Sequence, residues 1–377
     1  MFNAINDQGE LQSLYTKTKA EIDSCRQKAY YCPSCEEPLQ IRSGPRVTAH
    51  FAHFPNSDCH RGETLEHETG KWLLYKWTKH QGLHSELEKF LPEIRQRPDV
   101  WLTINNKQVA IEYQCATISE KEIRKRTSAY LSSGIFPLWV LGHHHLKYSS
   151  KKTLKLTPFL SSFLYHFHDQ YFLYFFNPQE CTISVASRLR TTSPRVCMAS
   201  IQCLSLHQMA FPDLFQSSPE KPLYSAVPFW EKLWYSHRTT YKKHVSTEER
   251  QFRQYVYLKG FHFSLIPSVC YLPVEGQITM KEKPFIWQTR LLMEYFLYVP
   301  MGGRVRFPVL KGRPTTNGYY PDVAYEYLKL LQSLGYVCQQ SNNTWIKTKE
   351  VYFHRHVDQA IEEDQKIMHA LKKLHRI

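Results

Sequence analysis

The sequence lacks a long uninterrupted hydrophobic run, although 42% of its 377 residues are hydrophobic. The most aromatic stretch, residues 159–176, is broken by four polar residues, His166, His168, Asp169 and Gln170. A membrane-spanning helix requires about 18 consecutive apolar residues, so we expect no transmembrane helix and no membrane partner. The opening segment, MFNAINDQGELQSL, also lacks the basic and apolar regions of a secretory signal peptide. Together these absences predict a cytoplasmic protein.

Acidic residues are scarce relative to basic ones. Lys and Arg number 48 against 34 Asp and Glu, which gives a formal net charge of +14. A basic excess of this size commonly serves a polyanion such as DNA or RNA, although a merely soluble basic protein remains an alternative. The ten cysteines lack the even spacing of a secreted disulfide framework, and we find no internal repeat or low-complexity tract. Both absences favour a globular protein of a reducing compartment.

The first 60 residues contain closely spaced cysteines and histidines. A Cys-x-x-Cys motif and, fourteen residues later, a His-x-x-His motif are formed by Cys32, Cys35, His50 and His53. Thiolates and imidazoles are the ligands of tetrahedral structural zinc sites. We therefore predict a small zinc-binding β module over residues 1–60. Cys59 or His60 could replace one of the histidines, and redox-active or free thiols are the alternative.

The segment RPDVWLTINNKQVAIEYQCA, residues 97–116, has the pattern of a β-hairpin. Its central Asn105-Asn106 pair suits a two-residue type I′ turn, because Asn tolerates positive φ. With this turn the numbers of paired residues sum to 211, so Asp99 lies opposite Glu112. Alternation directs Asp99, Glu112 and Gln114 to one face. The apolar residues of the other face are Val100, Leu102, Ile104, Val109, Ile111 and Tyr113. A turn shifted by one residue would change this register.

Two opposed carboxylates repel each other, and a bound divalent cation would remove the repulsion, since one or two carboxylates can hold Mg²⁺. Pro98-Asp99, twelve residues, then Glu112-x-Gln114 is the pattern of the PD-(D/E)xK nuclease superfamily, with Gln114 where Lys is usual. We expect Mg²⁺ or Mn²⁺ at Asp99 and Glu112, where it would activate a water for phosphodiester hydrolysis. Glu63 is the natural third acid. Two solvated acids on an exposed sheet face are the alternative.

Helical patterns precede and follow the hairpin. The first starts near Gly62 and ends at Gly82, and the second runs from the predicted N-cap Ser119 to Gly134. A buried strand, FPLWVLG, follows the second helix. The candidate DNA-binding residues on the two helices are His67, Lys71, Arg124, Arg126 and Tyr130. Arginine can bind phosphate oxygens with two hydrogen bonds, whereas solvated helix-face charges are the alternative for each residue.

Residues 148–377 give weaker signals. A hairpin about Asn177-Pro178 is followed by several helical patterns. A second PDV, at residues 321–323, precedes a helical pattern and has no Glu-x-Lys or Glu-x-Gln strand in register. We interpret it as a helix start with Asp322 in the first turn. The predicted fold is therefore α/β and multidomain: the zinc-binding β module, a PD-(D/E)xK (restriction-endonuclease-like) core over residues 61–147, and a helix-rich α+β domain over 148–377.

Several motifs together resemble the competence protein CoiA family of naturally transformable Gram-positive bacteria. They are YYCPSC, HFAH, GETLEHETGK, RPDV, IEYQCATIS and SSGIFPLWVLG, which span residues 30–142. The resemblance implies a zinc-finger-like part, a nuclease-like domain and a C-terminal domain of unclear role. It also implies a cytosolic task in natural transformation, in the recombination of incoming single-stranded DNA. The site that it implies comprises Asp99, Glu112 and Gln114, together with Glu63 and His67.

Two functions follow as hypotheses. The first is a Mg²⁺- or Mn²⁺-dependent nuclease acting on single-stranded or branched recombination intermediates, with recombination proteins as possible partners. The second is a non-catalytic DNA-binding accessory protein that keeps the nuclease fold. Gln114 leaves both open, because a neutral amide can only hydrogen-bond the attacking water that a lysine would polarise. A zinc-stapled scaffold for protein partners is a third reading, which requires that DNA affinity be absent.

Overall fold

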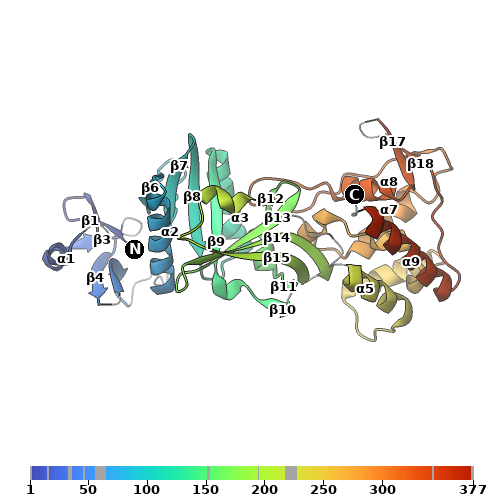
Figure 1. Ribbon diagram of the computed structural model, residues 1–377, viewed down its shortest axis with the longest axis horizontal. Helices are drawn as coiled ribbons and strands as arrows, with labels where there is room; N and C mark the ends of the chain where they lie inside the picture. The colour runs from blue at the N-terminus through green and yellow to red at the C-terminus, as the bar shows by residue number, and fades with distance from the viewer. Residues whose placement is uncertain are drawn as a thin grey trace. The chain divides into compact units, whose positions relative to one another are not determined.

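The computed structural model describes residues 2–14, 17–32, 36–45, 47–55, 65–150, 153–193, 195–216, 227–341 and 344–374 (Figure 1). The chain forms two compact units. Unit 1 comprises Met1–Leu146, Phe172–Ala186 and Ile201–Gln216, and unit 2 comprises Lys147–Tyr171, Ser187–Ser200 and Ser217–Ile377. Over the described ranges, none of the helices has the length and apolar character needed to cross a membrane.

Unit 1 begins with a five-stranded antiparallel sheet in the order β2-β1-β3-β4-β5. The strands are β1 Asn3–Asn6, β2 Leu11–Ser13, β3 Tyr30–Tyr31, β4 Pro38–Gly44 and β5 Val47–His53, with helix α1 at Lys19–Cys25. Gly9 adopts φ +80° in the turn between β1 and β2, a conformation that glycine reaches without steric cost. The turn joins β1 and β2 as an antiparallel pair.

The rest of unit 1 is a mixed sheet with helices on both faces. Its strand order is β6-β7-β8-β9-β13-β14, in which β8–β9 and β9–β13 pair in parallel and the other neighbours pair antiparallel. These strands are β6 His84–Leu87, β7 Val100–Ile104, β8 Lys107–Gln114, β9 Ile135–Gly142, β13 Gln170–Asn177 and β14 Thr182–Ser193. The first two residues of β13 and the residues of β14 from Ser187 onward belong to unit 2. The helices are α2 Leu65–His80 and α3 Glu120–Ser132, and two 3-10 turns span His143–His145 and Phe211–Phe215.

The two helices cover opposite faces of strand β8. Gly70 of α2 lies against the ring of Tyr113, whereas Tyr130 of α3 joins Trp101 and Ala110 in a hydrophobic cluster. The side chains of Ala110 and Tyr113 point to opposite faces, since they are three residues apart in a strand. The predicted order of helix, hairpin, helix and buried strand is confirmed. The predicted polar face of the hairpin is largely covered by α3, which the alternation pattern did not indicate.

Unit 2 is an α+β unit rich in helix. Its helices are α4 Pro158–Ser161, α5 Val227–Thr239, α6 Thr247–Leu258, α7 Pro284–Tyr295, α8 Val323–Ser333 and α9 Val357–Leu374, with 3-10 turns at Phe263–Leu265, Ser268–Tyr271 and Glu275–Thr279. Its strands are β10 Tyr148–Ser150, β11 Thr153–Lys155, β12 Tyr165–Phe167, β16 Arg304–Val305, β17 Val337–Ser341 and β18 Thr344–Lys347, and β15 Val196–Ser205 begins here and continues in unit 1.

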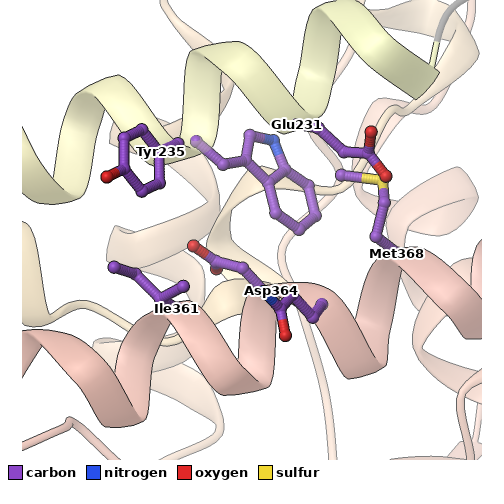
Figure 2. A pocket seen from close by; sticks show the side chains of 7 residues that line it. Glu231, Tyr235, Ile361, Asp364 and Met368 are labelled. Atoms are coloured by element: carbon purple, nitrogen blue, oxygen red, sulfur yellow. The ribbon is translucent and has the colours of Figure 1, made fainter.

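The second PDV starts a helix, as predicted. Asp322 lies at the N-cap of α8, one position before the first turn, and its Oδ1 accepts a hydrogen bond from the N–H of Tyr325 (3.1 Å). Helices α5 and α9 are joined by the buried ion pair of Arg238 with Asp364 (2.8 Å). Figure 2 shows the pocket of about 250 Å³ beside this pair, between the two helices. The pair satisfies both charges inside the core of unit 2.

Candidate functional site

The hairpin of β7 and β8 has the predicted register. Ile104 pairs with Lys107, and Asn105 and Asn106 in the turn have φ values of +48° and +62°, as a type I′ turn requires. The pairing continues without a bulge toward the start of β7. The predicted register is confirmed from Ile104–Lys107 to Val100–Ile111, and Asp99 lies directly before β7.

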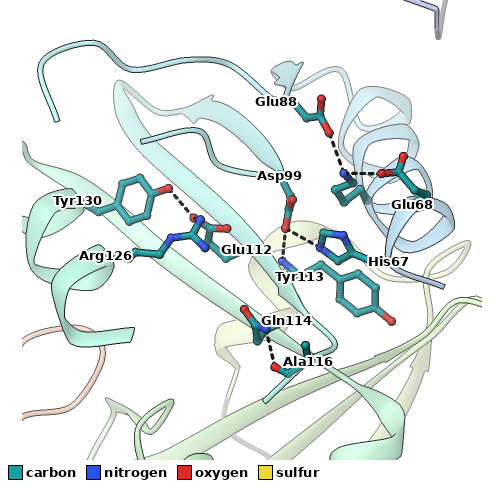
Figure 3. A network of polar contacts seen from close by, with 11 residues as sticks. His67, Glu68, Glu88, Asp99, Glu112, Tyr113, Gln114, Ala116, Arg126 and Tyr130 are labelled. Atoms are coloured by element: carbon teal, nitrogen blue, oxygen red, sulfur yellow. Dashed lines mark hydrogen bonds and ion pairs between the residues drawn. The ribbon is translucent and has the colours of Figure 1, made fainter. Parts of the chain in front are cut away.

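Glu112 is almost fully buried, with 3% of its surface exposed. Its Oε1 pairs with the guanidinium of Arg126 and accepts a hydrogen bond from the hydroxyl of Tyr130 (2.5 Å), and both partners come from α3 (Figure 3). Burial raises the pKa of Glu112 to about 7; Arg126 opposes the rise, and the charge of Asp99 adds to it. The reading of two solvated surface acids does not fit this burial.

Asp99 is held by groups of two other elements. Its Oδ2 accepts a hydrogen bond from the backbone N–H of Tyr113 (2.7 Å) and lies 3.4 Å from Nε2 of His67 on α2. The imidazole of His67 stacks on the ring of Tyr113, with the ring centroids 5.8 Å apart. Figure 3 shows Asp99 directed toward these two groups. The sequence-predicted His67 therefore does reach the acid at the start of β7.

Protein groups thus compensate each carboxylate separately. Arg126 and Tyr130 hold Glu112, whereas His67 and a backbone N–H hold Asp99. The argument from sequence for a bound cation did not include the groups that α2 and α3 supply, and these groups offset both charges. The charge of Asp99 nevertheless contributes to the raised pKa of Glu112, so some repulsion remains.

The oxygen-rich donor set is compatible with a hard divalent cation, since carboxylate oxygens are the ligands that Mg²⁺ and Mn²⁺ prefer. The hydrogen bonds from Arg126 and Tyr130 both go to Oε1 of Glu112. Among the described residues there is no group of three or more His, Cys, Asp or Glu side chains placed to hold a metal ion. The predicted third acid, Glu63, lies outside the described residues.

Gln114 lies at the end of β8 and is partly exposed. Its Nε2 donates a hydrogen bond to the carbonyl oxygen of Ala116 (2.5 Å). This bond identifies Oε1 as the atom that remains for a water or an ion. The amide is therefore oriented by the backbone, without a charge of its own.

Lys71 does not reach the surface. Its side chain is fully buried, with Nζ 3.1 Å from Glu68 Oε1 and 2.7 Å from Glu88 Oε1. The other oxygen of Glu88 accepts a hydrogen bond from the N–H of Phe2 (3.0 Å), and the N–H of Glu88 donates to the carbonyl oxygen of Asp99 (3.0 Å). The expectation that Lys71 contacts DNA is corrected: a buried lysine between two carboxylates stabilises the fold under the site.

The three candidates on α3 differ in exposure. The hydroxyl of the buried Tyr130 is bonded to Glu112, so Tyr130 also acts inside the protein. Arg126 is 24% exposed and is hydrogen-bonded to Glu112 and to Oε1 of Gln96 (3.2 Å for Nε). Arg124 is 51% exposed and pairs with Glu120 (2.7 Å). Arg124 is thus the candidate most accessible to a phosphate.

Sequence reasoning missed three groups near the site: Gln96, Glu68 and Glu88. Glu68 could have been found, because it lies three residues before Lys71 on a helix and such pairs meet. Glu88 and Gln96 come from loops around the start of β7, and no local pattern connects them to α2 or α3. Glu88 has a positive φ of +50°, a backbone conformation that a glutamate in the sequence does not predict.

The predicted zinc ligands are only partly brought together. Cys32 is fully buried in the core of the N-terminal sheet, and Cys35 lies outside the described residues. His50 and His53 are both in β5, whose pairing with β4 is regular between them. Residues three apart in a strand point to opposite faces, and His53 shares its face with the buried Phe51. The strand geometry therefore favours one of the two histidines, rather than both, as a ligand of a single ion.

These features define a mixed α/β protein with a nuclease-like domain, in which acids from neighbouring strands lie beneath two helices. The model of the competence protein CoiA nuclease-like domain matches residues 63–219, and the models of the CoiA N-terminal and C-terminal domains match residues 14–62 and 229–310. Competence protein CoiA of Bacillus subtilis (strain 168) is 30% identical over 291 residues, which are 75% of each chain. No solved structure matches. The chain belongs to the competence protein CoiA family.

Proposed function

We propose that the protein is a Mg²⁺- or Mn²⁺-dependent DNA nuclease with a PD-(D/E)xK core. The observation that carries this proposal is the buried Glu112 of β8, whose pKa is raised by burial and by the nearby Asp99, the residue directly before β7. A carboxyl whose pKa is raised by burial and by a neighbouring acid is characteristic of functional sites. A bound cation would add to the positive charge of Arg126 and favour the ionised form of Glu112.

A divalent ion at Asp99 and Glu112 would lower the pKa of a bound water and neutralise charge on the scissile phosphate. The chain's own residues have separate tasks. Arg126 and Tyr130 orient Glu112, and His67 with the Tyr113 N–H orients Asp99. Gln114 offers its amide oxygen as a hydrogen-bond acceptor for water, and Glu63 is proposed as a further acid.

The substrate that we propose is single-stranded or branched DNA formed during natural transformation and recombination in the cytoplasm. The family assignment and the net charge of +14 support this proposal. Arg124 and Arg126 are the candidate phosphate contacts on α3. Recombination proteins of the same process are proposed as partners.

The test is a cleavage assay with branched, duplex and single-stranded DNA in the presence of Mn²⁺ or Mg²⁺. We expect cleavage by the natural protein and a loss of at least about 100-fold in Asp99→Ala, since metal and charge stabilisation supply several kcal/mol. Glu122→Gln is the matched control, because Glu122 is an exposed acid of α3 and should leave the rate unchanged. Equal rates in Asp99→Ala and natural protein would refute the proposal.

A second candidate is a non-catalytic DNA-binding protein for recombination. Gln114 in place of lysine and the ion pair of Glu112 with Arg126 favour it, because the pair neutralises the acid without a metal. DNA binding without cleavage across Mg²⁺, Mn²⁺ and all three DNA forms would support this candidate over the nuclease.

We also propose that the N-terminal module binds one structural zinc ion. The ligands that we propose are Cys32 and His53, together with Cys35 and with Cys59 or His60, which lie outside the described residues. Cys32 and His53 both belong to the core side of the sheet, which supports this set over one containing His50. Zinc would stabilise a module whose own hydrophobic core is small.

A further inference from the structure

Unit 2 carries a groove between the segment after β16, helix α8 and the start of β18. Its volume is about 360 Å³, within the range of sites for small planar ligands. The side chains that matter for its chemistry are Arg306, Phe307, Val309, Tyr325 and Trp345. The groove therefore combines aromatic walls with an arginine at its edge.

The aromatic walls are held in place and are partly accessible. Tyr325 is 38% exposed and meets Trp345 edge to face, with ring centroids 6.1 Å apart. Nζ of Lys329 lies 5.4 Å from the Tyr325 centroid and 5.5 Å from that of Trp345. Phe307 is fixed from behind by stacking on Tyr327. An incoming flat ring would thus find a preformed aromatic face at Tyr325.

The charge around the groove is positive. Residues 304–313, RVRFPVLKGR, contain four basic residues and no acid, and Arg304, Arg306 and Lys311 are exposed. The acid in the groove wall, Asp322, is engaged as the N-cap of α8 by the Tyr325 N–H. The groove therefore suits a ligand that carries both flat rings and negative charge.

We propose that this groove binds single-stranded DNA, with one base stacked on Tyr325 and adjacent phosphates bound by Arg306 and Lys311. Every base offers a π face, so stacking on aromatic side chains beside a basic track recognises single strands without sequence preference. The bases of a duplex are already stacked and cannot enter. The proposal goes beyond the nuclease function, because the residues lie in unit 2 and binding requires no cleavage.

The test measures fluorescence anisotropy of labelled oligothymidine with the full chain in EDTA, which prevents cleavage. Tyr325→Ala should weaken binding about tenfold, since base stacking on an aromatic ring contributes at this level, whereas Tyr325→Phe should bind as the natural protein does. Tyr257→Ala is the matched control, because Tyr257 is a 74% exposed tyrosine of α6. Equal binding by Tyr325→Ala and Tyr257→Ala would overturn the proposal.

Arg306→Ala provides a second readout that does not depend on the aromatic core. The slope of log Kd against log salt should fall by about 0.7 for each lost phosphate contact on a single strand, whereas Lys366→Ala, at a 70% exposed lysine of α9, should keep the slope. An unchanged slope in Arg306→Ala would contradict the proposal. So would an equal effect of both groove variants on duplex DNA, or binding confined to RNA.

The outcome is separable from that of the nuclease proposal. Asp99→Ala should abolish cleavage and leave oligothymidine affinity unchanged, whereas Tyr325→Ala should reduce affinity in EDTA. If the protein binds oligothymidine through the groove but does not cleave DNA, only the nuclease proposal is refuted. Cleavage without any loss of affinity in the groove variants would refute only the groove.

Discussion

The buried Glu112 is tolerated near Asp99 because each of the two acids has its own partners. Glu112 is neutralised by Arg126 and bonded to Tyr130, and Asp99 is bonded to a backbone N–H and lies beside His67. Desolvation remains, and it raises the pKa of Glu112 to about 7. Repulsion between acids is thus managed by side chains from two helices.

The raised pKa of Glu112 predicts a pH-dependent stability. From its ordinary value of 4.5 up to about 7, the folded protein keeps a proton that the unfolded chain has released, so the free energy of unfolding falls as pH rises through this window. Between pH 5 and pH 8, the free energy of unfolding should fall on the order of 3 kcal/mol more in the natural protein than in Glu112→Gln. Urea denaturation at the two pH values measures this difference.

The exposed Glu122 provides the control for this pH effect. Glu122→Gln should keep the natural protein's pH dependence, because Glu122 is an exposed acid of α3, the helix that covers Glu112. An identical pH dependence in Glu112→Gln and the natural protein would show that Glu112 keeps an ordinary pKa.

Lys71 predicts a large effect on stability. Lys71→Ala leaves Glu68 and Glu88 buried without their cation, and removing one partner of a buried ion pair costs about 3–5 kcal/mol. Lys76→Ala on the same helix is the control, since Lys76 is exposed, and it should cost less than about 1 kcal/mol. Chemical denaturation measures both, and similar losses would contradict the buried network.

At the scale of elements, the contact between α2 and β8 positions His67 against Asp99. Gly70 makes this contact possible: a Cβ at that position would lie 2.1 Å from Cε1 of Tyr113. The glycine is required for the close approach of the helix to the ring. The distance between α2 and the sheet in turn fixes the His67 to Asp99 contact.

Gly70→Ala should therefore lower the free energy of unfolding by about 1–3 kcal/mol through overpacking. In a Tyr113→Ala background the same change should stabilise by about 0.5–1 kcal/mol, because alanine favours a helix more than glycine does. A double-mutant cycle by urea denaturation gives the sign of the change in the free energy of unfolding that Gly70→Ala causes in each background. The same sign in both backgrounds would exclude a clash with Tyr113 as the cause.

At the scale of the whole molecule, unit 1 gathers segments that are distant in sequence. Phe172–Ala186 and Ile201–Gln216 belong to the same unit as the first 146 residues, and β13 pairs in parallel with β9. The N-terminal module is linked to the nuclease-like part through the hydrogen bond of Phe2 to Glu88. A loss of order in the module would thus reach the buried network below Asp99.

The zinc proposal gives a matched prediction for this module. The natural protein should hold one zinc ion, and His53→Ala should lose it while His50→Ala retains it, because the two side chains leave β5 on opposite faces. Elemental analysis of the purified chains measures the content. Cys32→Ser should behave as His53→Ala does, with Cys203→Ser as the exposed control. Loss of zinc in His50→Ala alone would reverse the ligand assignment.

The sequence alone determined the local features of this protein. Backbone preferences and side-chain alternation, which neighbouring residues specify, determine three such features. They are the Asn105-Asn106 turn, the pairing of Ile104 with Lys107 and the helix start at Asp322. The motifs between residues 30 and 142 also sufficed to indicate the CoiA family, which the family models confirm.

Only the tertiary structure decided the surroundings of the two acids. Burial of Glu112 beneath α3 and enclosure of Lys71 between Glu68 and Glu88 both depend on which elements pack together. The spacing of residues along the chain does not show which face of a strand is covered by a helix. It also does not show which charged side chain of another element lies next to an acid. The electrostatics of the site follow from those long-range contacts.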